Sequence, residues 1–129
     1  MIRVVIADDV KELRSLIRHS LEADSRFEVV GEAGDGREAV DRSGELKPDV
    51  LVLDLSMPVM DGLSAIPRVH EVSPTTRILV FSGFEESGMA QRALAATASA
   101  YLTKGAPPDE VVSQVAAVAA APPKRGSNE

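Results

Sequence analysis

Short apolar runs alternate along the chain with longer stretches of helical period, which is typical of β-α units around a parallel sheet. Five runs are rich in Val, Ile and Leu and are too short and too apolar for exposed alternating strands. They predict strands at residues 3–7, 27–31, 50–53, 78–81 and 100–103. The pattern therefore predicts an α/β fold built from five βα units.

The stretches between these runs predict five helices. The first carries apolar residues at three- and four-residue spacing, which predict one buried stripe made of Val10, Leu13, Leu16, Ile17 and Leu21. The others are expected at residues 36–43, 63–72, 85–96 and 109–121. Pro67 lies inside the third of the five, where it removes a backbone donor, so we expect a kink or an interruption there.

The length of the chain limits its organisation. At 129 residues it is large enough for one domain with a core and too short for two ordinary ones. The apolar pattern stops at Pro122, which predicts one domain over residues 1–121 and a linker stub or disordered tail over residues 122–129. No apolar run approaches the ~20 residues of a membrane span, and no charged leader precedes the first strand. We expect a cytoplasmic protein that binds no membrane.

Composition narrows the chemistry that is open to the chain. It contains no cysteine, which excludes disulfides, thiolate metal sites and cysteine nucleophiles. Its formal charge of −6 argues against nucleic-acid binding by this chain itself, because such binding depends on clustered Lys and Arg. Any chemistry therefore uses oxygen and nitrogen groups.

Polar residues stand where the predicted strands end. Asp8 and Asp9 follow the first strand, Asp54 follows the third, Ser82 the fourth and Lys104 the fifth. Ligand sites of open α/β sheets form beyond these carboxyl ends. Three crowded carboxylates repel one another unless their pKa values rise or a hard cation neutralises them, and Mg²⁺ suits an acidic pair beside a third aspartate. An Asp pair alone would more often cap a helix, but the register with Asp54 and Lys104 favours a cation site.

This residue set points to phosphoryl transfer. The Asp54 carboxylate would attack a phosphorus atom, the Lys104 ammonium would stabilise the charge on the phosphoryl oxygens, and Ser82 would hydrogen-bond one of them. His19 and His70 have no ligand partner at metal spacing, and we assign both to surface or helix positions.

With these motifs in order, the chain resembles a response-regulator receiver domain of a two-component phosphorelay over residues 1–121. The resemblance is carried by Asp8-Asp9, Asp54 with Met57-Pro58 and Asp61-Gly62 after it, Ser82-Gly83, and Tyr101 three residues before Lys104. It implies a doubly wound, five-stranded parallel sheet of order 2-1-3-4-5 with five helices. It also implies a signalling phosphoacceptor and not an enzyme that turns over a substrate.

The resemblance further implies roles for single residues. Asp9, Asp54 and the backbone carbonyl of Ser56 would bind Mg²⁺, with Asp8 beside them, and a sensor histidine kinase would donate the phosphoryl group. Ser82 and Tyr101 would switch the surface formed by the fourth helix, fifth strand and fifth helix, which is a candidate for homodimerisation on phosphorylation. The positions of Ser56 and Phe84 would set the lifetime of the phosphoryl group. We expect the bulky Phe84 to prolong that lifetime.

Residues 103–110, in which Gly105 follows Lys104, are similar to receivers of NarL/LuxR-type transcription regulators. This similarity implies a helix-turn-helix output domain that is missing from this sequence, and a stand-alone receiver is the alternative. An aspartate-nucleophile phosphohydrolase would need a second acid/base aspartate soon after Asp54, and Leu55-Ser56 lacks it. A nucleotide-binding module is disfavoured because no Gly-rich phosphate loop follows any strand.

Overall fold

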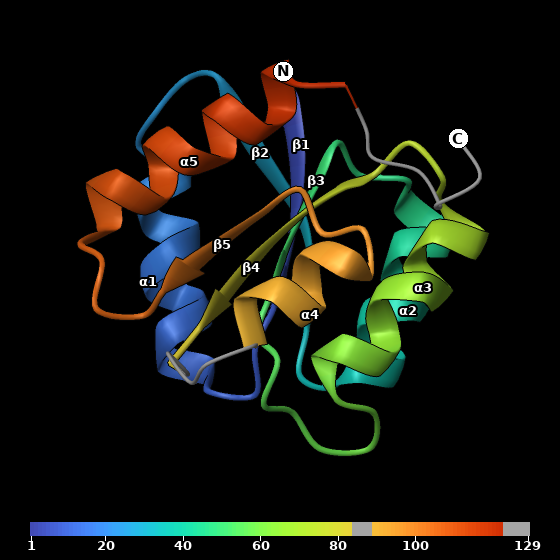
Figure 1. The fold of residues 1–129 in the computed structure, drawn as a ribbon. Coiled ribbons are helices and arrows are strands. Elements are labelled where there is room, and N and C mark those ends of the chain that lie inside the picture. The colour runs from blue at the N-terminus through green and yellow to red at the C-terminus, as the bar shows by residue number, and fades with distance from the viewer. Residues whose placement is uncertain (84–88, 123–129) are drawn as a thin grey trace.

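A parallel sheet forms the centre of the computed structural model, which describes residues 1–83 and 89–122 (Figure 1). Its strand order is β2-β1-β3-β4-β5. The strands are Ile2–Ala7 (β1), Phe27–Ala33 (β2), Val50–Leu53 (β3), Arg77–Ser82 (β4) and Ala100–Thr103 (β5). The helices are Lys11–Glu22 (α1), Gly36–Leu46 (α2), Gly62–Val72 (α3), Met89–Ala95 (α4) and Pro108–Ala120 (α5). The predicted fold class and strand order are confirmed.

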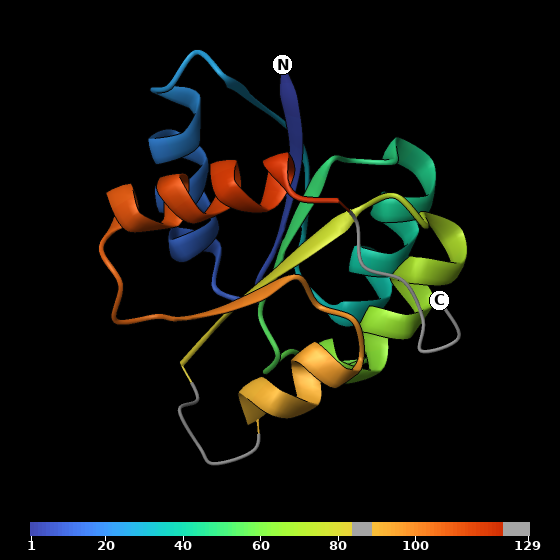
Figure 2. The same cartoon turned by 45° about the horizontal axis from the view of Figure 1, so that its top comes forward.

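Helices cover both faces of this sheet, with α1 and α5 on one face and α2, α3 and α4 on the other (Figures 1 and 2). Alternate strand residues point to opposite faces. In β1, Val4 and Ile6 therefore pack with α1 and α5, whereas Val5 packs with α2 and α3. Burial of each such side chain stabilises the fold by about 1.5–3 kcal/mol, which explains why the strands read as continuous apolar runs.

The chain reverses direction across the sheet at β1. It leaves β1 for β2 on one side and returns to β3 on the other. The carboxyl ends of β1 and β3 are thus direct neighbours, and the Asp54 amide donates to the Ala7 carbonyl at 3.0 Å. This edge is the switch point at which doubly wound sheets bind ligands.

The predicted stripe on the first helix is partly wrong. Ile17 and Leu21 are buried, but Val10 is 46% exposed and Leu16 is 48% exposed. Val10 is the N-cap residue and precedes the first turn of α1. Leu16 lies about 100° around the helix from Ile17, since an α-helix has 3.6 residues per turn, and so leaves the buried face.

Proline does not interrupt the third helix. α3 runs through Pro67 as one helix, and the proline is exposed whereas Ile66 and Val69 are buried. Packing of the buried face maintains the helix although Pro67 removes one backbone donor.

Two predicted segments fall partly outside the described residues. The predicted fourth helix began at residue 85, but residues 84–88 are not described, and the structure gives α4 from Met89. Most of the predicted tail, residues 123–129, is likewise not described. None of the helices within the described residues combines the length and the apolar character that crossing a membrane requires.

Candidate acidic site at the sheet edge

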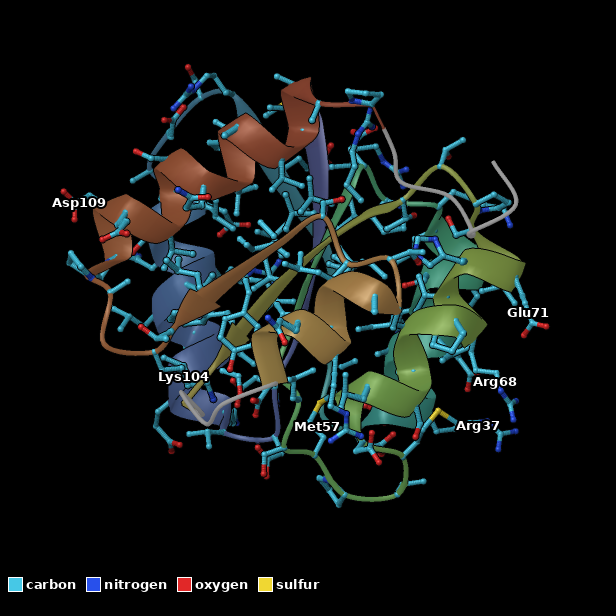
Figure 3. All side chains as sticks on the ribbon, viewed as in Figure 1. Arg37, Met57, Arg68, Glu71, Lys104 and Asp109 are labelled. Atoms are coloured by element: carbon cyan, nitrogen blue, oxygen red, sulfur yellow. The ribbon has the colours of Figure 1, made fainter. Side chains whose placement is uncertain are left out.

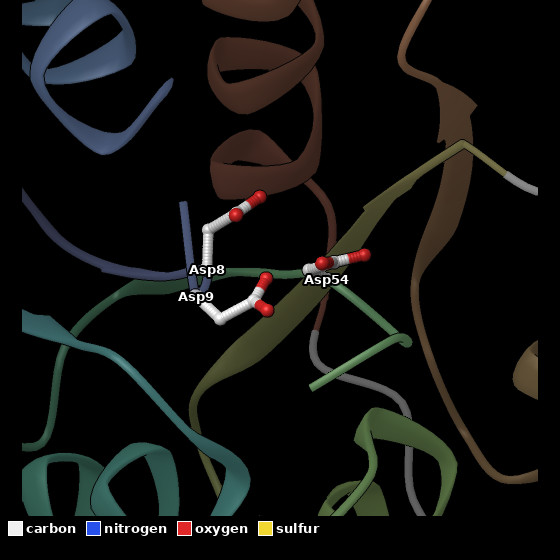
Figure 4. A group of neighbouring side chains, drawn as sticks. All are labelled: Asp8, Asp9 and Asp54. Atoms are coloured by element: carbon white, nitrogen blue, oxygen red, sulfur yellow. The ribbon is translucent and has the colours of Figure 1, made fainter. Parts of the chain in front are cut away.

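Three aspartates meet at the switch point. Asp8 and Asp9 directly follow β1 and Asp54 directly follows β3, and one carboxylate oxygen from each lies within 4.8 Å of the others (Figure 4). Asp8 is 2% exposed and Asp54 is 3% exposed, whereas Asp9 is open to solvent. Two carboxylates are therefore buried, and the third borders on water.

Lys104, which directly follows β5, contacts two of these aspartates. Lys104 Nζ lies 2.7 Å from Asp8 Oδ2 and 3.3 Å from Asp54 Oδ2. Its backbone amide donates to the Ser82 carbonyl at 2.9 Å, which fixes the residue at the lower edge of the sheet in Figure 3. Three carboxylates and one ammonium leave two negative charges, which matches the charge of a divalent cation.

The surroundings of the Lys104–Asp54 pair shift the pKa of both residues. Burial raises the pKa of Asp54, and the charge of Asp8 raises it further, although the Lys104 ammonium opposes the shift. Burial lowers the pKa of Lys104, but the hydrogen bond that Lys104 donates to Asp8 and the charges of both carboxylates outweigh this effect, so that the pKa is raised. Lys104 is therefore firmly protonated at neutral pH, whereas Asp54 carries its charge at a free-energy cost.

The loop after β3 supports Asp54 from behind. Asp54 Oδ1 accepts a hydrogen bond from the Ser56 amide at 3.2 Å, and the Gly62 amide donates to the Leu55 carbonyl at 2.9 Å. A Cβ atom at Gly62 would lie 2.4 Å from the Asp54 carbonyl oxygen, so the loop can close only over glycine. Ser56 itself is exposed beside the acidic group.

Ser82 ends β4, the strand between those of Asp54 and Lys104. It is 0% exposed, and its Oγ has no hydrogen-bond partner among the described residues. Leaving a buried hydroxyl unpaired costs about 1–3 kcal/mol. An unpaired hydroxyl at this edge suits a site that receives an oxygen-rich group.

The structure brings together four of the predicted site residues, Asp8, Asp9, Asp54 and Lys104, with Ser82 on the intervening strand. Tyr101 in β5 is half-buried and packs against the core on the α2–α4 side. Phe84 lies outside the described residues. Within the described part of the chain, the three aspartates are the group of His and acidic side chains that could hold a metal.

The two histidines lie apart from this group. His19 is exposed on α1, and His70 Nε2 lies 3.0 Å from the Thr97 carbonyl oxygen. Both positions agree with the prediction of surface or helix roles.

The sequence reasoning missed two residues, Arg14 and Glu32. Arg14 Nη1 donates to the backbone carbonyl of Asp8 at 2.5 Å, and its Nε donates to Glu32 Oε1 at 3.0 Å. The signals were an arginine in the first turns of the helix after the acidic pair, and a glutamate directly after the predicted strand of residues 27–31, which in the structure continues to Ala33. Neither signal reveals the pairing without the position of β2 beside β1.

Comparisons with known proteins agree with this geometry. Residues 4–116 match the model of a family described as the response regulator receiver domain. The chain is 36% identical over 110 residues to the chemotaxis protein CheY of Thermotoga maritima, covering 85% of this chain and 91% of that protein. It is also similar to the signal receiver domain of the putative response regulator NarL from Mycobacterium tuberculosis, with a TM-score of 0.88 and 34% identity over 92% of this chain and 95% of that one.

Other relatives are longer than this chain. A protein-glutamate methylesterase/protein-glutamine glutaminase of Azospirillum brasilense is 37% identical over 98% of this chain, but the match covers only 35% of that protein. The chain thus corresponds to one part of such relatives, which also contain regions that it does not match.

Proposed function

The chain belongs to the response-regulator receiver family, and from this premise we propose that Asp54 accepts a phosphoryl group from a sensor histidine kinase. The observation that carries the proposal is the pairing of buried Asp54 with Lys104 at 3.3 Å, beside two further aspartates at the switch point. The protein would act as a signalling phosphoacceptor in the cytoplasm, and the phosphoryl group would be its signal.

The transfer is a displacement at phosphorus. A carboxylate oxygen of Asp54 forms a bond to the phosphorus of a phosphohistidine, the P–N bond breaks, and its electron pair returns to the imidazole of the donor. Lys104 is within reach of the oxygens of the arriving group and offsets their negative charge. Burial of Asp54 excludes competing water and strengthens this attraction.

The acidic residues have the donor set and the charge that a hard divalent cation requires. Both carboxylate oxygens of Asp8 already have partners, Lys104 at 2.7 Å and the Val10 amide at 2.8 Å. The exposed Asp9 is therefore the better direct ligand of the acidic pair. Asp54 is the second ligand, because its oxygens have longer contacts than those of Asp8, at 3.3 Å to Lys104 and 3.2 Å to the Ser56 amide, and the Ser56 carbonyl is a further candidate. When bound there, Mg²⁺ supplies positive charge to the phosphoryl oxygens and retains several waters.

The signal would leave the site through two other residues. Ser82 Oγ would donate to a phosphoryl oxygen and so gain the partner that it lacks among the described residues. Tyr101, two strand residues before Thr103, would follow this movement and change the surface of α4, β5 and α5. That surface would serve homodimerisation or binding of an output module, and the positions of Ser56 and Phe84 would adjust how long the phosphoryl group survives.

The similarity to NarL and to LuxR-family regulators supports a transcription regulator whose DNA-binding part lies outside this sequence. The match to 91% of the Thermotoga CheY protein supports a receiver that functions alone. Both readings use the same acidic site and differ only in the partner of the switched surface.

Beryllofluoride, an analogue of the phosphoryl group, tests the site without a kinase. Adding it with Mg²⁺ to the ¹⁵N-labelled protein should shift backbone resonances around Asp54, Ser82 and Tyr101, and Asp54→Ala should abolish the shifts. An unchanged spectrum of the parent protein, or shifts that persist in the variant, would refute the proposal.

A further inference from the structure

The Arg14 side chain connects the loop that carries the acidic pair to the neighbouring strand β2. Its Nη1 donates to the Asp8 backbone carbonyl at 2.5 Å, and its Nε donates to Glu32 Oε1 at 3.0 Å. These are two separate nitrogens of one rigid, planar guanidinium. Arg14 therefore fixes the distance and the direction between the loop and the strand.

The Asp8 backbone is held by β2 on both of its polar groups. Its amide donates to the Ala33 carbonyl at 3.0 Å, and its carbonyl accepts from Arg14, which Glu32 holds from the preceding position of β2. The Asp8 carbonyl belongs to the planar peptide group that joins Asp8 to Asp9. Fixing that plane restricts the directions in which the Asp9 side chain can point.

Glu32 is itself held firmly. Its second oxygen, Oε2, accepts from Arg18 Nη1 at 2.6 Å, so two arginines of α1 grip one carboxylate. Burial raises the pKa of Glu32, but the hydrogen bonds from Arg18 and Arg14 outweigh it and lower this pKa overall. Glu32 is a charged anchor for Arg14 at neutral pH.

We propose that Arg14, anchored by Glu32, is a positioning residue for the cation site. It orients the Asp8–Asp9 peptide so that the Asp9 carboxylate meets a divalent cation together with Asp54. The inference rests on the proposed function, because it assumes that the acidic group binds Mg²⁺. Attachment of α1 to the sheet is a separate matter, since the buried Ile17 and Leu21 provide it.

Replacing Arg14 distinguishes a positioning role from a purely electrostatic one, because the two roles predict opposite changes in Mg²⁺ affinity. Arg14→Gln removes a positive charge near the acidic group, so charge alone would tighten Mg²⁺ binding. Loss of positioning would weaken it, by about tenfold if Arg14 resembles other outer-shell residues that orient metal ligands. Arg14→Lys keeps the charge but offers one nitrogen in place of two, and its affinity should also be reduced.

Arg18→Gln is the charge-matched control, because it removes the other arginine on Glu32 but leaves both hydrogen bonds of Arg14, to Glu32 Oε1 and to the Asp8 carbonyl. Its Mg²⁺ affinity should equal that of the parent protein or exceed it slightly. Val118→Ala, in the buried face of α5 and distant from the loop, reports whether loss of stability alone changes the affinity.

The measurement is a Mg²⁺ titration followed through the backbone amide resonances of ¹⁵N-labelled protein, with thermal unfolding recorded for each variant. Weaker binding in Arg14→Gln and Arg14→Lys, with Arg18→Gln and Val118→Ala near the parent value, supports the inference. Parent-like or tighter binding in Arg14→Gln, full recovery in Arg14→Lys, or equal weakening in Val118→Ala would overturn it. Failure of the parent protein to bind Mg²⁺ would instead contradict the proposed function.

Discussion

The amino and carboxyl ends of β3 and β4 lie at opposite edges of the sheet, and the polar side chains buried at these two ends differ in whether they find hydrogen-bond partners. At the amino ends of β3 and β4, Ser73 and Thr76 are fully buried. Their hydroxyls lie 2.6 Å apart, and Thr76 Oγ1 donates to the Pro48 carbonyl at 2.7 Å. This network is neutral and closed, as buried polar groups in a structural role generally are.

The opposite edge remains open. Asp8, Asp9, Asp54 and Lys104 together carry two negative charges, and the Ser82 hydroxyl has no partner among the described residues. The same strands thus end in a satisfied network on one side and an unsatisfied one on the other. Ser43 Oγ and Ser99 Oγ are also buried without a hydrogen-bond partner among the described residues, so an unpaired hydroxyl alone does not mark a site. At the carboxyl ends it coincides with an excess of negative charge, and a ligand there would supply the missing charge and hydrogen bond together.

The largest expected effect concerns the open edge. Mg²⁺ at a hundred times its dissociation constant should raise the free energy of unfolding by about 2.7 kcal/mol, since it binds only the folded site. Asp9→Asn should remove most of this gain, whereas Asp41→Asn, an exposed aspartate on α2, should keep it. Urea unfolding with and without Mg²⁺ measures both, and an equal gain in Asp9→Asn would contradict the assignment of the ligands.

The closed edge should respond in the opposite way. Thr76→Val keeps the shape but leaves the Ser73 hydroxyl and the Pro48 carbonyl without their partner, which should cost about 2 kcal/mol of unfolding free energy. The stabilisation by Mg²⁺ should remain. Ser20→Ala, which removes an exposed hydroxyl bonded to the Leu16 carbonyl, should cost less than about 0.5 kcal/mol. A Thr76→Val protein as stable as its parent would show that closure of the network is unimportant.

The smallest effect concerns the ion pairs of the partly exposed Glu32 with Arg14 and Arg18, which belong to neither of these two ends. The folded-state pKa of Glu32 is lowered, so its stabilisation is fully present above the ordinary glutamate pKa of 4.5 and is lost as the pH falls through the folded-state value. Glu32→Gln should therefore cost less than about 1 kcal/mol at pH 7 and still less at about pH 3.5. Urea unfolding at both pH values tests this, and a cost that grows on acidification would contradict the sign.

Much of the acidic site could be predicted from sequence because parallel strands all deliver their carboxyl ends to one edge. Once the strands before Asp8 and Asp54 are identified, their meeting follows from the fold class. Lys104 follows by the same reasoning, although its contact with both Asp8 and Asp54 required the structure.

Features that depend on packing between elements could not be predicted. The Arg14–Glu32 pair requires the register of α1 against β2, and the spacing of 18 residues between them carries no periodic signal. The exposure of Leu16 depends on which face of α1 packs against the sheet. The apolar spacing alone predicted a wider buried face than the structure has. α3 continues through Pro67 because tertiary burial of its other face outweighs the local cost of proline.

The most direct test of the central claim is to locate the phosphoryl group chemically. The protein would be phosphorylated with acetyl phosphate and Mg²⁺ and then reduced with borohydride, which converts an aspartyl phosphate to homoserine and allows the position to be mapped by peptide mass spectrometry. The account predicts homoserine at position 54 of the parent protein and none in Asp54→Asn. Homoserine at Asp8 or Asp9, or its absence from the parent protein, would contradict the account.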